Sequence, residues 1–175
     1  MTVPAETKTV EVPWQVLPGY QCFGCSPSNE QGLRLTFTRN GAGIETRLLL
    51  GRAFESYPGV VHGGIATTVC DEIMGNLLVL RVGATVFTTT LRTRYLAPLK
   101  IGVEYRCVAT TDAGPDTPAP LRARAEILGP DGSQHVTAVA DYQPATEEQA
   151  RRRMAISDSD AALVQQAITA HRIEN

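Results

Sequence analysis

The residues best suited to chemistry lie between Tyr57 and Glu72, where His62-Gly63-Gly64 precedes a long apolar stretch. First-turn N–H groups of a helix have no intrahelical acceptor and lie at the positive end of its dipole, so they can hold a developing oxyanion. Glycine at such a position lets a substrate carbonyl approach the backbone closely. Gly63 and Gly64 are equally consistent with close packing alone, so both interpretations stand at this point.

Asp71 is a carboxylate among apolar residues of the same stretch, close to Val69 and Ile73. A buried carboxylate is unfavourable unless it is paired or used in a reaction. Glu72 follows directly, and neighbouring residues of a helix point about 100° apart, so the two acids cannot both face one reacting atom. At most one of them is expected to be catalytic.

If Gly63 and Asp71 act on one substrate, their spacing predicts a site made by two subunits. The two residues are eight positions apart, which is about 12 Å along a helix. One carbonyl cannot contact both groups at about 3 Å, the distance that the chemistry requires. A two-fold axis that sets two copies of the helix antiparallel would bring Asp71 of one copy to Gly63 of the other. We therefore expect a homodimer or a dimer of dimers.

The surrounding pattern predicts one central helix and an antiparallel sheet. Apolar residues cover nearly every side of the segment from Gly63 to about Val82, which is typical of a buried helix that ends at Gly83. A turn at Asn40-Gly41 joins the first two of the predicted strands. Alternating or strand-like runs predict strands over residues 32–38, 44–50, 85–96, 103–111, 121–128 and 134–142.

A length of 175 residues suits one domain, which we place at residues 21–145. Residues 1–20 are expected to form an N-terminal arm, and 146–175 a peripheral helical tail. A net charge of -2 gives no electrostatic basis for binding nucleic acid or an anionic membrane. The start of the chain does not resemble a secretory signal, so a cytoplasmic location is expected.

Four cysteines are expected to be reduced thiols. The pair in Cys22-Phe23-Gly24-Cys25 suits either half of a zinc site or a redox pair. A zinc ribbon needs a second pair, whereas Cys70 and Cys107 stand alone on a predicted helix and a predicted strand. A thioredoxin-like pair would cap a helix, but this pair precedes a strand. We therefore expect no metal.

The segment from Tyr57 to Glu72 resembles the signature of hotdog-fold thioesterases of the phenylacetic-acid-degradation type, within the 4-hydroxybenzoyl-CoA thioesterase superfamily. Cys22-Phe23-Gly24-Cys25 with Asn29 and Gly32-Leu33, and the stretch at 93–102, are also similar. The likeness runs from about residue 20 to 143. It implies an α+β hotdog fold, with an antiparallel sheet wrapped round one long central helix. It also implies hydrolysis of acyl-CoA to free acid and CoA, without a cofactor beyond the CoA of the substrate.

Carried over by position, the resemblance implies that the Gly63 N–H forms the oxyanion hole. Asp71 would be the catalytic acid, supplied by the partner subunit, as nucleophile or as general base for water. His62 would orient the loop or contact the thioester, although a histidine there can equally cap the helix. Thr88 matches the hydroxyl residue that holds the water or the acid in this family.

Further positions are candidates for substrate contact. The strand threonines have the alternative of simply lining the sheet, and the basic side chains suit CoA phosphates but also suit a solvated face. These candidates are Gly64, Ser56, Thr89, Thr90, Arg92, Arg94 and Lys100.

Two other functions compete with hydrolysis. A non-catalytic acyl-CoA binding module would have no need of a buried carboxylate such as Asp71. A hotdog dehydratase or hydratase would need a histidine paired with an acid, but His135 lies on a distant predicted strand and His171 in the tail. Thioester hydrolysis is therefore the leading prediction.

Overall fold

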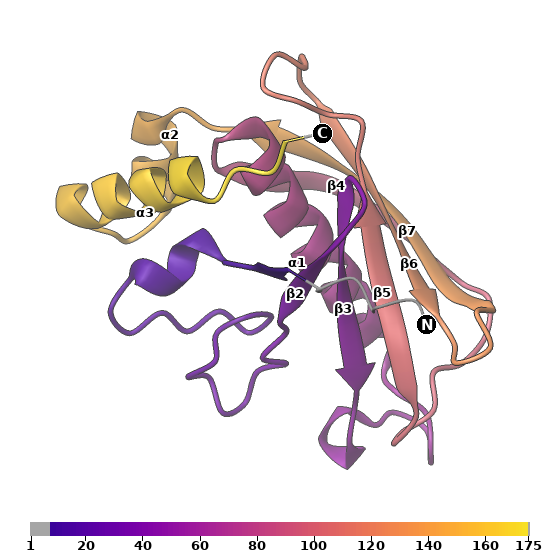
Figure 1. The fold of residues 1–175 in the computed structure, drawn as a ribbon. Coiled ribbons are helices and arrows are strands. Elements are labelled where there is room, and N and C mark those ends of the chain that lie inside the picture. The colour runs from indigo at the N-terminus through magenta and orange to yellow at the C-terminus, as the bar shows by residue number, and fades with distance from the viewer. Residues whose placement is uncertain (1–7, 175) are drawn as a thin grey trace, which may run out of the picture.

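A long helix, α1 (Gly63–Val82), lies against one face of a seven-stranded antiparallel sheet that curves around it (Figure 1). The computed structural model describes residues 8–174. The strands are β1 (Thr9–Val10), β2 (Phe37–Asn40), β3 (Gly43–Leu49), β4 (Val86–Tyr95), β5 (Glu104–Thr110), β6 (Leu121–Leu128) and β7 (Gln134–Pro144). The remaining helices are η1 (Pro13–Val16), η2 (Arg52–Phe54), α2 (Glu147–Arg153) and α3 (Asp158–Ala170). This arrangement confirms the predicted antiparallel sheet around one central helix.

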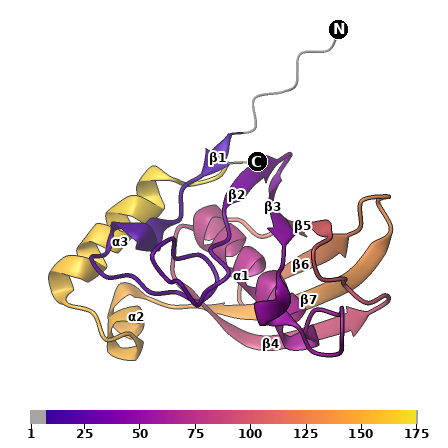
Figure 2. The same ribbon diagram turned by 90° about the horizontal axis from the view of Figure 1, so that it is seen from below.

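The order of the strands places β4 at an edge of the sheet. The sequence of neighbours is β1-β2-β3-β5-β6-β7-β4, so α1 carries the chain from β3 across the sheet to the far side of β7 (Figures 1 and 2). Within the described residues, β4 pairs along one side only, with β7. Its ten residues therefore leave a long free edge beside α1.

Small side chains on the inner face of the sheet let α1 lie close to it. Ala123 pairs with Ala140 and Ala125 with Ala138, and all four are buried on β6 and β7. The facing side of α1 is fully buried, and each of its large apolar side chains contributes about 1.5–3 kcal/mol by leaving water. The position of the helix is thus fixed by packing along most of its length.

The predicted limits of the central helix are confirmed. Gly63 begins it and Val82 ends it, and Gly83 follows in the left-handed conformation at φ 76°. The strands predicted at 44–50, 85–96, 103–111, 121–128 and 134–142 are each found within about two residues of their predicted ends. The tail also forms two helices, with a break before Asp158 at the N-cap Ser157.

The strand predicted at residues 32–38 is wrong over most of its length, because β2 begins only at Phe37. The backbone of Leu33 and Leu35 donates instead to the carbonyls of Phe23 and Gly24, at 2.7 and 2.9 Å. Arg34 between them has φ 49°, which a regular strand does not permit. The alternation of apolar and polar residues correctly indicated which side chains face inward. The backbone of these residues, however, pairs with the loop that contains Cys22 and Cys25 and not with a strand.

The N-terminal segment and the tail pack together on the far end of α1. Residues 1–7 of the expected arm lie outside the described residues, whereas β1 pairs with β2 and the chain then forms η1. Val164 and Ile168 of α3 are buried in a cluster with Val79 of α1, and Trp14 packs against it. Among residues 8–174, no helix is long and apolar enough to cross a membrane.

Candidate active site

The carboxylate of Asp71 is held by two hydroxyl groups of the sheet. Thr88 on β4 donates to Oδ1 at 2.9 Å, and Tyr142 on β7 donates to the same oxygen at 3.0 Å. The Tyr142 hydroxyl also lies 3.2 Å from the Asp71 carbonyl oxygen. Tyr142 is 1% exposed, and burial followed by the charge of Asp71 raises the pKa of its hydroxyl, which therefore stays protonated as a donor. Both bonds go to Oδ1, and neither holds Oδ2.

A β-bulge explains why Thr88, and not the next threonine, reaches Asp71. Thr88 lies opposite Tyr142 but Thr90 lies opposite Asp141, so Thr89 is the additional residue on β4. Its hydroxyl donates to the Asp141 carbonyl at 2.9 Å. Bulges commonly re-aim side chains in this way. The contact that was assigned to Thr88 therefore exists, while its catalytic role remains a prediction.

The N-terminus of α1 is fixed by His62 and Tyr95. Nδ1 of His62 accepts from the Gly64 N–H at 3.0 Å, so this histidine caps the helix, which was the predicted alternative to orienting the loop or contacting the thioester. The Tyr95 hydroxyl donates to the Gly63 carbonyl at 3.0 Å and lies 2.6 Å from the Thr67 hydroxyl. The Gly63 N–H, at the first turn, has no acceptor within the helix.

Gly63 and Asp71 lie at opposite ends of an exposed surface between α1 and the edge of β4, which we call the open strip. Thr88 near the start of β4 marks the Asp71 end, and Tyr95 at its last residue marks the Gly63 end. Because α1 is unbroken between the two, their separation is about 12 Å, as expected. One chain therefore does not bring them to a single carbonyl.

The other predicted residues divide between two regions. Ser56 and Lys100 lie in the loops beside the start of α1, where Val60 forms a bridge with Lys100 and Ser56 N–H donates to the Val60 carbonyl. Gly64 is exposed in the first turn of α1.

By contrast, three strand residues point away from α1. Strand residues alternate between faces, and Thr93 and Tyr95 face the helix, so the even-numbered side chains from position 90 to 94 face outward. One chain therefore does not bring these three to Asp71 or Gly63: Thr90, Arg92 and Arg94.

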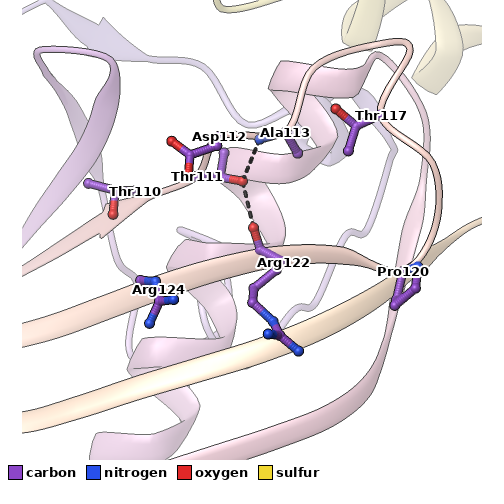
Figure 3. A pocket seen from close by; sticks show the side chains of 8 residues that line it. All are labelled: Thr110, Thr111, Asp112, Ala113, Thr117, Pro120, Arg122 and Arg124. Atoms are coloured by element: carbon purple, nitrogen blue, oxygen red, sulfur yellow. Dashed lines mark hydrogen bonds between the residues drawn. The ribbon is translucent and has the colours of Figure 1, made fainter.

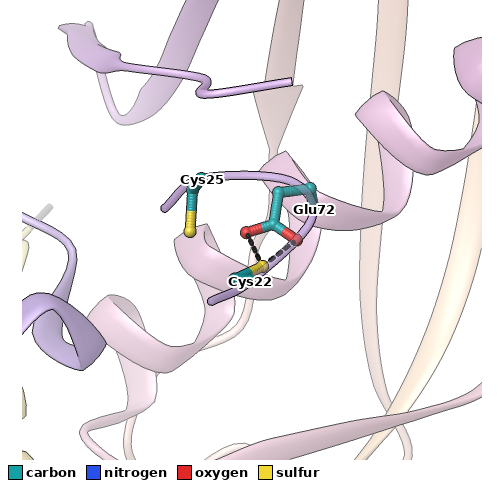
Figure 4. Close-up of side chains that lie close together, drawn as sticks. All are labelled: Cys22, Cys25 and Glu72. Carbon is teal, nitrogen blue, oxygen red and sulfur yellow. Dashed lines mark hydrogen bonds between the residues drawn. The ribbon is translucent and has the colours of Figure 1, made fainter. Parts of the chain in front are cut away.

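Glu72 points into different surroundings from Asp71, as the helical spacing predicted. Both of its carboxylate oxygens lie 3.5 Å from the sulfur of Cys22, and Asn76 donates to Oε1 at 2.9 Å. Figure 4 shows Glu72 directed at the loop that carries Cys22 and Cys25. Burial raises the pKa of Glu72 to about 7. Sequence reasoning assigned no role to this acid.

Tyr95 and Tyr142 are the contacts that sequence reasoning did not identify. Tyr95 stood within the recognised stretch at 93–102 and carried no assigned role. Tyr142 is 71 residues from Asp71, and the packing of α1 against β7 brings the two together. A tyrosine at an inward strand position was its one visible signal, because a buried hydroxyl usually finds a partner.

A separate cavity of about 240 Å³ lies where β5 joins β6 (Figure 3). Among its lining residues, the Thr111 hydroxyl donates to the Arg122 carbonyl at 2.7 Å. The guanidinium of Arg122 is engaged with Asp141 at 2.7 and 2.9 Å. This cavity contains none of the residues predicted to be catalytic.

Comparison with known proteins identifies a similar family and similar folds. A family described as the thioesterase superfamily matches residues 58–113, which contain α1, β4 and β5. No curated protein matches the chain.

Solved structures share the fold at low identity. A thioesterase superfamily protein is 19% identical with a TM-score of 0.61, and the match covers 66% of this chain but only 56% of that one. A putative thioesterase from Ralstonia eutropha JMP134, described as phenylacetic acid degradation-related, is 21% identical with a TM-score of 0.57, covering 70% and 92%. A hypothetical thioesterase from Streptococcus pneumoniae TIGR4, solved with coenzyme A, is 19% identical with a TM-score of 0.55, covering 61% and 83%. The hotdog fold and the resemblance to the thioesterase superfamily are confirmed.

Proposed function

We propose that this protein hydrolyses acyl-CoA thioesters to a free acid and CoA, as a thioesterase of the phenylacetic-acid-degradation type. The family match supports thioester hydrolysis, and the related structure that contains coenzyme A supports CoA as the carrier. One observation carries the proposal: the Asp71 carboxylate is held at Oδ1 by Thr88 and Tyr142, on the same open strip as the N-terminus of α1. A fixed carboxylate and an anion-binding helix end are the two groups that acyl transfer to water requires.

The chemistry follows from these two groups. As a general base, Asp71 takes a proton from a water molecule whose oxygen attacks the thioester carbon. The resulting oxyanion is held by the Gly63 N–H, whose hydrogen bond strengthens as the negative charge develops. Collapse of the intermediate breaks the carbon–sulfur bond, and the CoA thiolate leaves and receives a proton. As a nucleophile, Asp71 would attack the carbon itself and expel the CoA thiolate, and water would then release the acid from the resulting mixed anhydride and regenerate the carboxylate.

The edge strand supplies a route to a shared site. An exposed edge presents unpaired N–H and C=O groups that can pair with a second strand. Beside the β4 edge, Tyr95 and Leu96 are 56% and 53% exposed, which is high for large apolar side chains. We propose that β4 pairs with β4 of a second copy about a two-fold axis.

This pairing would join the two halves of the site. Two copies of β4 that pair antiparallel about their centre place residues near one end opposite residues near the other end, so Thr88 would face Thr93 of the partner, two residues from its Tyr95. Thr88 is hydrogen-bonded to Asp71 and Tyr95 to Gly63, and neighbouring strands lie about 4.8 Å apart. Asp71 of one copy would thereby approach the oxyanion hole of the other.

A panel of acyl-CoAs tests the activity, with free CoA measured by a thiol-reactive dye. Hydrolysis by the parent protein should fall about a hundredfold or more in Asp71→Ala, which is the usual scale for the loss of a general base. Glu72→Ala is the matched comparison, because it removes the next carboxylate of the same helix. Hydrolysis that survives in Asp71→Ala and is lost in Glu72→Ala would overturn the assignment. Binding of acyl-CoA with no release of CoA would identify a binding module.

Mixed dimers test the shared site. Asp71→Ala and Gly63→Val should each be inactive as homodimers, because every site lacks one group. In a heterodimer, one site contains both lesions and the other contains neither, so about half of the parent activity should return. Co-expression with two different tags isolates the heterodimer. Heterodimers that stay inactive would mean that each chain contains a complete site.

A further inference from the structure

Three potential metal ligands converge on the side of α1 that the proposed hydrolysis does not use. The donor atoms of Cys22, Cys25 and Glu72 all lie within 4.8 Å of one another (Figure 4). They come from two segments, because both cysteines belong to the loop that follows η1 whereas Glu72 belongs to α1. Cys25 is 1% exposed, and all four cysteines are free thiols. The second cysteine pair that a zinc ribbon would need is replaced here by a carboxylate.

The distances suit a tetrahedral ion. Zinc binds thiolate at about 2.3 Å and carboxylate oxygen at about 2.1 Å, so tetrahedral geometry separates a sulfur from an oxygen by about 3.6 Å. The Cys22 sulfur lies 3.5 Å from both Glu72 oxygens. The Cys25 sulfur would need to move inward by no more than about 1 Å to complete the sulfur–sulfur edge of about 3.8 Å. Thiolates select soft or borderline ions over magnesium and calcium, so Zn²⁺ fits this donor set best.

The loop is shaped to present the two sulfurs to Glu72. The Gly24 N–H donates to the Cys22 sulfur at 3.3 Å, a contact that favours a thiolate. A side chain at Gly24 would meet the Glu72 carboxyl at 2.4 Å, so glycine is what permits the close approach of the loop to the acid. Ser26 Oγ donates to the Tyr20 carbonyl at 2.7 Å and closes the turn around Cys25.

Outer contacts hold the donors in place. Asn76, one turn further along α1, donates to Glu72 Oε1 at 2.9 Å, and the Tyr20 hydroxyl lies 3.3 Å from the Cys25 sulfur. Metal ligands are commonly oriented by such partners. Cys22, Glu72 and Asn76 also line a hollow of about 320 Å³, large enough to admit a water molecule as fourth ligand.

We propose that Cys22, Cys25 and Glu72 bind one Zn²⁺ per chain, with water as the fourth ligand, and that the ion ties the cysteine-containing loop to α1. The loop between η1 and β2 has no regular secondary structure. A metal ion bound to both the loop and α1 would therefore hold the loop in place, as packing of a strand would do elsewhere. The inference goes beyond thioester hydrolysis and does not rest on it.

Cobalt spectroscopy of the full chain tests the site. The protein is stripped with a chelator, reduced with a phosphine so that the reductant contributes no thiol, and titrated with Co²⁺. We expect one ion per chain, with the near-ultraviolet thiolate-to-cobalt band and the intense visible bands of tetrahedral cobalt. Zn²⁺ should then displace the cobalt and abolish both sets of bands. Zinc affinity is measured by competition with a chromogenic chelator.

The variants separate ligands from neighbours. Cys22→Ser, Cys25→Ser and Glu72→Gln should each weaken zinc binding by more than about 100-fold, beyond the 10–100-fold loss that an outer partner causes. Asn76→Ala should fall within that smaller range. Asp71→Asn, which removes the adjacent carboxylate, and Cys107→Ala, which removes a distant thiol, should bind zinc like the parent.

Three results would overturn the proposal. The first is a reduced parent protein that binds no cobalt. The second is cobalt that binds without a thiolate band, or equally well in Cys22→Ser, which would identify an adventitious ion. The third is a parent protein whose Cys22 and Cys25 form a disulfide and which binds no zinc after reduction. Because Asp71→Asn should keep the metal while losing hydrolysis, failure of the metal site and failure of the proposed function are distinguishable.

Discussion

Removing the two hydroxyls that hold Asp71 should reduce activity unequally. Tyr142→Phe deletes a donor that is 1% exposed, so no water can replace it at Oδ1. Thr88→Val deletes a donor of the same oxygen on an exposed strand edge, where water can take its place. Phenylalanine and valine keep the shapes of the residues that they replace, so each change isolates one hydrogen bond.

The magnitudes follow from this difference in exposure. A buried hydrogen bond to a charged group contributes about 1.5–3 kcal/mol, and about 1.4 kcal/mol corresponds to a factor of ten in rate. If the full contribution is felt in the transition state, Tyr142→Phe should lower kcat/KM by roughly ten- to hundredfold. An exchangeable bond contributes about 0.5–1.5 kcal/mol, so Thr88→Val should lower it by about two- to tenfold. Both losses should be smaller than that of Asp71→Ala.

The assay is steady-state hydrolysis of the best acyl-CoA from the panel, with thermal unfolding measured in parallel to exclude misfolding. Thr89→Val should lose less activity than Thr88→Val, because the Thr89 hydroxyl donates to the backbone carbonyl of Asp141 and not to Asp71. Thr169→Val, which removes a hydroxyl on α3, is a distant control. A Thr88→Val loss equal to or larger than that of Tyr142→Phe would refute the reasoning from exposure. Parent activity in both variants would refute the role of the hydroxyls.

Two further predictions concern the ends of α1. Tyr95→Phe removes the hydroxyl that bonds the first turn of the helix, and kcat should fall about three- to tenfold with little change in KM, as expected of a group that positions the oxyanion hole. Ile168→Ala empties a fully buried position of α3 and should cost about 2–5 kcal/mol in urea unfolding, whereas Leu163→Ala, 45% exposed on the same helix, should stay within about 1 kcal/mol. A Tyr95→Phe variant with changed KM alone, or equal costs at the two α3 positions, would contradict these expectations.

Local patterns predicted the central helix and most of the strands, while the family resemblance supplied the hotdog fold and the choice of Thr88. The limits of α1 follow from apolar residues on nearly every side and from Gly83, whose left-handed backbone ends the helix. The divergence of Asp71 and Glu72 follows from helical geometry alone. Such features depend on residues a few positions apart, which is the range over which a sequence pattern is informative.

The remaining contacts depend on long-range pairing, which no local pattern encodes. Tyr142 meets Asp71 because α1 packs against β7, and the choice of Thr88 depends on a bulge that the threonine run does not reveal. The contact of Cys22 with Glu72 depends on an irregular loop, in the region where the predicted strand at 32–38 was wrong. In each of these cases, tertiary structure decides between alternatives that the local sequence leaves equivalent.

Asp71 and Glu72 are adjacent acids whose surroundings assign them different chemistry. Asp71 faces two neutral hydroxyl donors beside an open strip, which leaves one oxygen for water or substrate. Glu72 faces a sulfur and an amide in a more enclosed place, where burial raises its pKa to about 7. Burying a carboxylate is costly, and a positive ion beside it would offset that cost. The same turn of α1 would thus be fixed from the sheet side by hydroxyls and from the loop side by a metal. Such a double attachment would keep the Asp71 carboxylate, the proposed catalytic group, in one position relative to the sheet.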